Sequence, residues 1–155
     1  MTFRITGLSP EPFRHLFGLP DAALAEHGAK RYAVPRVPGY PDRIELRDAD
    51  AGETVLLLNY LHQPAETPYR ASHAIFVREG AEAAYDAIGE VPPALCSRVI
   101  SLRGFGADHC IVDADLADGK ELEAAIGRLF ALPDVAYIQA HYAKFGCYAA
   151  RIERA

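Results

Sequence analysis

Two stretches of the chain carry the clearest patterns of apolar and polar residues. Residues 54–60, TVLLLNY, are apolar almost throughout, which is typical of a central strand covered on both faces. Residues 119–132 predict an amphipathic helix, preceded by Asp118 as its capping residue, with Glu121 three positions later. Its apolar face is formed by Leu122, Ile126, Leu129 and Phe130. We expect the helix to pack on the sheet that contains the strand.

Shorter patterns predict the other elements. Residues 43–47 alternate strictly between charged and apolar side chains, as in a half-buried strand. Further strands are expected at 3–6, 31–34, 73–78, 98–103, 109–113, 135–142 and 147–153, the last two forming a hairpin around Gly146. Short helices are expected after Ser9 and Pro10, over residues 21–27 and over residues 81–88.

These elements indicate the α+β class. Several predicted strands are joined by turns too short for a crossover helix, which antiparallel pairing allows and parallel pairing does not. We therefore expect a single, mainly antiparallel sheet, with residues 119–132 packed on one face and the short N-terminal helices at an edge. A chain of 155 residues fits one domain, residues 1–155.

Composition and charge narrow the choice of partners and compartment. The net charge of −5 argues against nucleic-acid binding, which usually needs a basic face. No apolar run approaches the ~18 residues of a membrane span, and no secretory leader is evident. The three cysteines form no C-x-x-C pair, which argues against a disulfide framework or structural zinc and favours the cytoplasm.

Chemistry-bearing side chains gather around the connection that follows the central strand. Residues 61–72 form a long connection, and loops of that length in compact domains are usually functional or disordered. His62 and His73 flank it and are candidate catalytic acid and base, because imidazole titrates near neutral pH. Arg70 and Ser72 are candidate ligand-binding residues, Arg70 through a bidentate fork to an anion. Alternatively, Arg70 only ties the loop to backbone carbonyls.

The C-terminal hairpin adds another candidate. His141 is expected to form a further wall of the same site and is a candidate ligand-binding residue. If residues 144–146 form a three-residue loop, His141 faces Ala149 and shares a face with Cys147. A thiolate–imidazolium pair is then conceivable, whereas a shift of one residue would separate the two side chains. The simpler interpretation is that Cys147 is a small buried hydrophobe.

We predict no metal and no cofactor. His62, His73, His109, His141 and Asp113 could supply ligands, but no pair has the spacing of a familiar motif such as H-E-x-x-H.

Three functional hypotheses follow, and the third, which the sequence favours least, is a mononuclear metal site. The first is a protein that binds a small molecule, an anion among the options, or acts as a hydrolase or lyase through a histidine and arginine site at residues 61–73. The second is a non-catalytic binding or interaction protein that forms a homodimer through a sheet edge or the C-terminal hairpin. A convergent pocket that holds at least three of His62, Arg70, His73 and His141 would favour the first hypothesis.

The chain also resembles a known family. The stretch HQPA-x-TPYR-x-SHAIFVR within residues 54–81, the C-terminal stretch of residues 135–155 and the opening FRITGLSPEPF are similar to the bacterial family catalogued as domain of unknown function 1203. The resemblance implies a bacterial, cytoplasmic, single-domain protein. It assigns no activity, cofactor or catalytic residue to any position.

Overall fold

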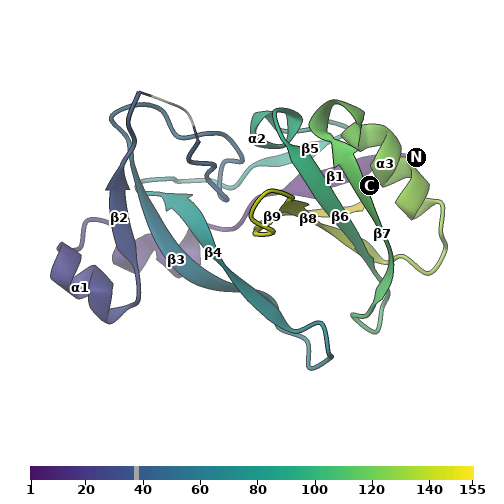
Figure 1. The fold of residues 1–155 in the computed structure, drawn as a ribbon, viewed down its shortest axis with the longest axis horizontal. Helices are drawn as coiled ribbons and strands as arrows, with labels where there is room; N and C mark the ends of the chain where they lie inside the picture. Colours follow the sequence, from purple (N-terminus) through teal and green to yellow (C-terminus); the bar gives the residue numbers. More distant parts are fainter. Residues whose placement is uncertain (37–38) are drawn as a thin grey trace.

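The computed structural model describes residues 1–36 and 39–155, and its strands form two antiparallel sheets (Figure 1). The strand order is β5-β1-β9-β8-β6-β7 in the six-stranded sheet and β2-β3-β4 in the three-stranded sheet. The α+β class is confirmed, but the expected single sheet is wrong. The strands are β1 (Phe3–Thr6), β2 (Lys30–Ala33), β3 (Thr54–Gln63), β4 (Ala71–Arg78), β5 (Asp86–Ile88), β6 (Val99–Phe105), β7 (Ile111–Asp118), β8 (Tyr137–Tyr142) and β9 (Tyr148–Arg154). The helices are η1 (Glu11–Leu16), α1 (Asp21–Glu26), α2 (Pro93–Cys96), η2 (Gly119–Glu121) and α3 (Leu122–Phe130).

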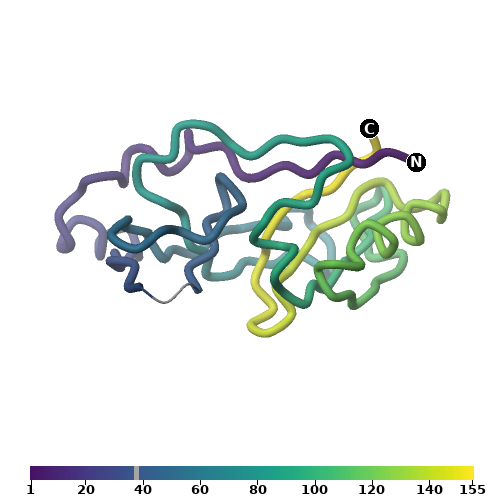
Figure 2. Tube along the Cα trace, turned by 90° about the horizontal axis from the view of Figure 1, so that it is seen from above, coloured from purple at the N-terminus to yellow at the C-terminus, as the bar shows by residue number. Residues whose placement is uncertain are grey.

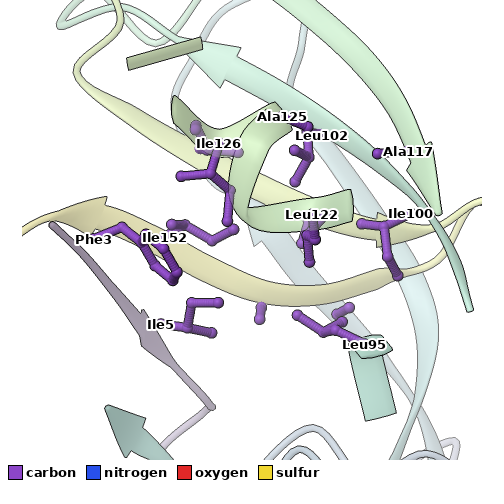
Figure 3. Packing of buried hydrophobic residues seen from close by; sticks show 14 of the residues in the cluster. Phe3, Ile5, Leu95, Ile100, Leu102, Ala117, Leu122, Ala125, Ile126 and Ile152 are labelled. Atoms are coloured by element: carbon purple, nitrogen blue, oxygen red, sulfur yellow. The ribbon is translucent and has the colours of Figure 1, made fainter. Parts of the chain in front are cut away.

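The six-stranded sheet and α3 enclose the larger core (Figure 3). The predicted amphipathic helix is confirmed: Leu122 and Ile126 are buried against sheet residues that include Ile100 and Leu102. The Asp118 carboxylate accepts a hydrogen bond from the amide of Lys120 at 3.1 Å, so it caps the helical segment as expected. This packing covers one face of the sheet with Ile138 and Ala140 of β8, and Gln139 and His141 point to the other face.

The three-stranded sheet has a separate core. The predicted central strand is confirmed, since β3 lies between β2 and β4. Leu56, Leu58 and Ile75 on one face of the sheet pack with Leu24 of α1 and Phe13 of η1. The short N-terminal helices therefore cover a face of this second, smaller sheet, and their expected place at the edge of a single sheet is wrong.

Residues 43–47 do not form the predicted strand. They make a tight turn in which the Asp42 carboxylate accepts from the amide of Glu45 at 2.6 Å, and Leu46 takes a left-handed φ of 53°. The alternating pattern arises because Ile44 and Leu46 are fully buried at the junction of the two sheets. The turn lies so close to β1 that a Cβ on Gly7 would be 2.1 Å from the carbonyl oxygen of Ile44.

Two further expectations are corrected. Residues 81–88 do not form a helix, because β5 pairs with β1 and Tyr85 exchanges backbone hydrogen bonds with Gly7 and Ile44. A short helix gains little from local propensity alone, so tertiary pairing decides its conformation. The expected connection of residues 61–72 is also too long: β3 runs to Gln63 and β4 starts at Ala71, which leaves residues 64–70 as a hairpin loop.

The chain ends lie side by side in the six-stranded sheet (Figure 2). β1 pairs with β9, and Thr2 bonds through its hydroxyl to the carbonyl of Ala155 at 2.9 Å. Among the helices of residues 1–36 and 39–155, none has the length and apolar character needed to cross a membrane.

Candidate functional site

Three histidines meet where the β3–β4 hairpin contacts the open face of the six-stranded sheet. His62 comes from β3, His73 from β4 and His141 from β8. One ring nitrogen from each lies within 4.8 Å of those of the other two. Residues from three different strands are therefore joined into one cluster, which we call the histidine cluster (His62, His73 and His141).

A β-bulge in β3 aims His62 at this face. Leu61 pairs with Ser72 and Gln63 pairs with Ala71, so His62 is the extra residue. Consecutive residues normally point to opposite faces of a strand, yet His62 contacts Gln139 and Gln63 contacts Tyr137, both on one face of β8. The bulge thus turns two neighbouring polar side chains into the same interface.

Gln139 fixes the proton on His62. Its amide nitrogen donates to the carbonyl oxygen of His62 at 3.0 Å, which leaves its Oε1 to accept from His62 Nδ1 at 2.9 Å. The lone pair of His62 therefore lies on Nε2, and Nδ1 of His73 is 3.0 Å from that atom. His73 serves as the donor in this contact, because two lone pairs would otherwise face each other.

His141 is oriented in the same manner. Its Nδ1 lies 3.0 Å from the carbonyl oxygen of Gly146, whereas its Nε2 lies 3.3 Å from Gln139 Oε1. The shorter contact assigns the proton to Nδ1 and the lone pair to Nε2. Tyr148 packs its ring 5.8 Å from that of His141 and stacks on His62 at 5.4 Å, so an aromatic wall supports both imidazoles.

Burial keeps the two inner histidines neutral. His141 is fully buried and His62 is 8% exposed. Desolvation lowers the pKa of His141 to about 3, and the nearby positive charge of Arg103 adds to the shift. Desolvation also lowers the pKa of His62, opposed by its hydrogen bond to Gln139. At neutral pH both rings thus offer lone pairs rather than positive charge.

His73 forms the boundary between the histidine cluster and a pocket of about 720 Å³. The pocket lies between the two sheets, with the tip of the β8–β9 hairpin on its rim. Its apolar walls include Leu57, Phe76, Val99 and Phe145. Its polar side chains are Arg43, Arg98, Lys144, Tyr142, Cys147 and His73, and none of the described residues that line it carries a carboxylate. A hollow of this size and character is typical of a small-molecule site.

Arg43 is the buried cation of this pocket. It is 1% exposed, and its guanidinium donates to the carbonyls of Tyr148 at 2.8 Å and Pro41 at 2.6 Å and to the sulfur of Cys147 at 3.0 Å. Two of these acceptors are backbone carbonyls, and none of them is a carboxylate. Desolvation lowers the pKa of Arg43, although a guanidinium stays protonated in proteins.

Tyr142 lies between two guanidinium groups. Arg43 is 4.8 Å and Arg98 is 5.2 Å from the centre of its ring. Asp48 pairs with Arg98 at 2.6 Å and neutralises that charge. The Tyr142 hydroxyl is buried without a hydrogen-bond partner among the described residues, and desolvation raises its pKa to about 12. The hydroxyl therefore stays protonated at neutral pH and is a hydrogen-bond donor without an acceptor among the described residues.

The two other predicted ligand-binding residues lie outside this arrangement. Arg70 is exposed in the 64–70 loop, where its guanidinium donates to the carbonyl oxygen of Pro64. Ser72 is exposed on β4 and, as the neighbour of His73, points to the opposite face. Three of the four side chains expected to converge do so, and the arginine near them is Arg43 rather than Arg70.

His141 and Cys147 do not form the thiolate–imidazolium pair that a three-residue loop at 144–146 would have allowed. His141 is opposite Tyr148, not Ala149, because the β8–β9 register shifts between Ala140 and His141. Cys147 is then directly opposite Tyr142, whose amide donates to its carbonyl at 2.9 Å. The shift separates the thiol from the imidazole, and Cys147 contacts Arg43 instead.

Sequence reasoning missed Gln139 and Arg43. Gln139 had a usable signal, since it lies two residues before His141 on a predicted strand and so shares its face. Arg43 had none, because its role depends on a turn that resembles a strand in sequence.

The histidine cluster offers three imidazole nitrogens, a donor set that suits borderline transition metals. The pocket beside it is lined by cationic side chains that could attract an anion. No curated protein and no solved structure is detectably similar to the chain. The model of the family described as "Protein of unknown function (DUF1203)" matches residues 39–154, a range that includes the histidine cluster and the polar side chains of the pocket. The chain therefore belongs to the DUF1203 family.

Proposed function

We propose that the protein binds a small anion with an apolar body in the pocket between its two sheets. The observation that carries this proposal is the buried guanidinium of Arg43, which has no carboxylate within ion-pair distance among the described residues. Asp42 precedes it, but its carboxylate accepts from the amides of Glu45 and Arg78. Asp42 and Cys147 act on the Arg43 charge only through space or through sulfur, and a buried guanidinium without a directly paired carboxylate favours an anionic ligand.

Two further groups support an anion. Lys144 adds a cation at the exposed rim of the pocket. The Tyr142 hydroxyl is a buried donor without a partner among the described residues, and an anion that accepts from it would remove that cost. A carboxylate or a phosphate has the geometry to accept from a guanidinium and a hydroxyl together.

The apolar walls define the rest of the ligand. Leu57, Phe76 and Val99 surround the cationic end, so a bare ion would leave most of the pocket unfilled. An aromatic or branched aliphatic body would bury apolar surface there at roughly 25 cal/mol per Å². The three cysteines are free thiols, which supports the cytoplasmic setting that forms part of this proposal.

Binding is tested with matched probes on chelator-treated protein. Benzoate and phenyl phosphate combine charge with an aromatic body, acetate and inorganic phosphate carry only the charge, and benzyl alcohol carries only the body. We expect the first two to raise the melting temperature and to bind by calorimetry, and the other three to bind much more weakly. Equal binding of benzyl alcohol and benzoate would refute a site that selects anions.

Two substitutions locate the site. Tyr142→Phe should weaken benzoate binding about tenfold, the size of one hydrogen bond to a charged group, while the melting temperature without ligand stays the same or rises. Lys144→Gln should weaken binding by a smaller factor and increase its tolerance of salt. The controls are Tyr69→Phe in the hairpin loop and Lys120→Gln beside α3, both remote from the pocket. If both Tyr142→Phe and Lys144→Gln bind as tightly as the native chain, the pocket is not the site.

A further inference from the structure

We infer that His62, His73 and His141 form a mononuclear site for a divalent transition metal, with zinc as the best match. This site goes beyond the proposed anion binding and does not depend on it. Zinc sites built from three histidines keep a further coordination position open for water or a ligand. His73 lines the pocket, so the open position faces the space where the anion would bind.

The ring nitrogens are close to the spacing that zinc needs. Zinc–nitrogen bonds of about 2.0–2.1 Å at tetrahedral angles place the nitrogens of two ligands about 3.3–3.4 Å apart. Nε2 of His62 and Nδ1 of His73 are 3.0 Å apart, and the donor atoms of the whole cluster span at most 4.8 Å. Coordination would move the His73 proton from Nδ1, where it faces His62, to Nε2. Small rotations of the rings would then bring all three nitrogens to coordination distance.

The hydrogen bonds around the cluster give the stronger argument. A histidine that binds a metal usually donates its other ring N–H to an oxygen, which fixes the tautomer and orientation of the ring. His62 donates Nδ1–H to Gln139 Oε1 and His141 donates Nδ1–H to the carbonyl of Gly146. In both rings the lone pair therefore lies on Nε2, which is free for a metal, although the two residues lie on different sheets.

The surroundings determine which metal suits the site. The donors are three neutral imidazoles without a carboxylate, which suits zinc rather than magnesium or calcium. Arg103 contributes a positive charge near His62 and His141, so a dication here needs an anion on its open position. Water bound to zinc in such a site loses a proton more readily, which provides Lewis-acid chemistry suited to hydrolysis.

Stoichiometry and affinity test the site. Protein stripped with a chelator and reloaded should retain one zinc per chain by elemental analysis after dialysis. Substitution with cobalt(II) should give the intense visible absorption of a tetrahedral ion. The cobalt(II) protein should also show paramagnetically shifted, exchangeable proton resonances from the imidazole N–H groups of His62 and His141.

Matched variants separate this site from adventitious binding. His73→Gln is the informative variant, because His73 is only partly buried and the folded state should survive the change. We expect it to weaken zinc binding at least a hundredfold and to abolish the rise in melting temperature on zinc addition. The control replaces His15 and His27, an exposed pair with ring centres 5.6 Å apart, by glutamine. That double variant should bind zinc as the native chain does.

The opposite results would overturn the inference. They are less than one zinc retained per chain, or binding that survives His73→Gln and disappears when His15 and His27 are replaced. Anion binding is measured on chelator-treated protein, so a failure of the metal proposal would not affect the anion proposal. Likewise, a protein that binds no anion could still bind zinc.

Discussion

His62 Nε2 lies 3.0 Å from Nδ1 of His73, although the two residues are separated by 11 positions and a hairpin loop. Regular pairing in this hairpin places Tyr60, not His62, opposite His73. The bulge after Leu61 inserts His62 as an unpaired residue and directs its ring across the sheet interface toward Gln139. The closest contact of the candidate site thus depends on one irregular position in β3.

The side-chain amide of Gln139, which lies between the two sheets, should contribute strongly to the stability of the protein. Gln139→Leu removes the acceptor for His62 Nδ1–H and the donor to its carbonyl, and both groups stay buried. Unsatisfied buried polar groups cost about 1–3 kcal/mol each, so we expect the unfolding free energy of the metal-free protein to fall by about 2–3 kcal/mol. Urea denaturation of the native and variant proteins measures this difference in unfolding free energy.

The same substitution also bears on the metal site. Loss of the partner of a metal-binding histidine typically lowers metal affinity 10–100-fold, so zinc binding by Gln139→Leu should fall by that factor. The control Asn59→Ala, at an exposed position of β3, should change stability by less than about 0.5 kcal/mol. A Gln139→Leu protein as stable as the native chain would contradict the role assigned to the amide.

Regular patterns predicted the regular parts of the fold. The amphipathic helix, the apolar central strand and the C-terminal hairpin each follow from periodicity that local geometry and burial impose together. The periodicity of apolar residues does not tell whether the strands form one sheet or two. β3 is equally apolar whether the elements that cover it belong to its own sheet or to another, so pairing partners are a tertiary property.

The candidate site depended on irregularities that sequence does not report. His62, His73 and His141 were singled out because they flank predicted strands, and the structure does bring them together. The bulge at His62 and the register shift at His141 each add one residue to a strand, which reverses the face of everything beyond them. Arg43 was missed for a related reason, since its turn buries alternate residues as a strand does.

An acidic group outside the site should control stability at low pH. Glu79 accepts from Arg31 Nε at 2.6 Å and Nη2 at 2.9 Å, and from the amide of Gly18 at 2.8 Å. The hydrogen bonds to Arg31 are the main cause that lowers the pKa of Glu79 from 4.5 to about 2. The folded state then binds fewer protons than the unfolded state between these values, so the stabilisation is complete above about pH 4.5 and is lost as the pH falls toward 2.

Glu79→Gln tests this contribution. We expect the variant to be less stable than the native chain at pH 7 by roughly 1–2 kcal/mol, with the difference shrinking as the pH is lowered from 4.5 toward 2. Thermal unfolding across that range provides the measurement. Glu82→Gln, at an exposed position whose carboxylate has no ion pair among the described residues, is the control. A difference that stays constant over the whole range would show that the carboxylate charge is not responsible.

Metal and anion should bind cooperatively if both proposed sites exist. His73 belongs to the histidine cluster and also lines the pocket, so an anion there can occupy the open position of the metal. We expect zinc to tighten benzoate binding about tenfold, and benzoate to tighten zinc binding by the same factor, because coupling between two equilibria is reciprocal. Calorimetry with and without each partner gives both factors. Affinities that are independent of the partner would place the anion away from the metal.

Replacement of two glycines by alanine should change the stability of the protein in opposite directions. Gly7 lies under the 41–48 turn, where a Cβ would be 2.1 Å from the carbonyl oxygen of Ile44, a backbone atom that cannot rotate away. Gly7→Ala must displace the turn that carries Arg43, and we expect a loss of at least about 3 kcal/mol, in the range of severe overpacking. Gly127 lies on the exposed side of α3, with no atom within 4 Å of an added Cβ. Gly127→Ala should therefore stabilise the protein by about 0.5–1 kcal/mol through helix propensity.

Chemical denaturation of both glycine variants gives the comparison. The Gly7→Ala protein should also lose benzoate binding, since the displaced turn moves the Arg43 guanidinium away from Tyr142. The Gly127→Ala protein should bind benzoate as the native chain does, because α3 covers the opposite face of the sheet from the histidine cluster. A Gly7→Ala protein with native stability would show that the 41–48 turn is not packed against β1 as described here. Native stability combined with lost benzoate binding would instead locate the effect in the pocket alone.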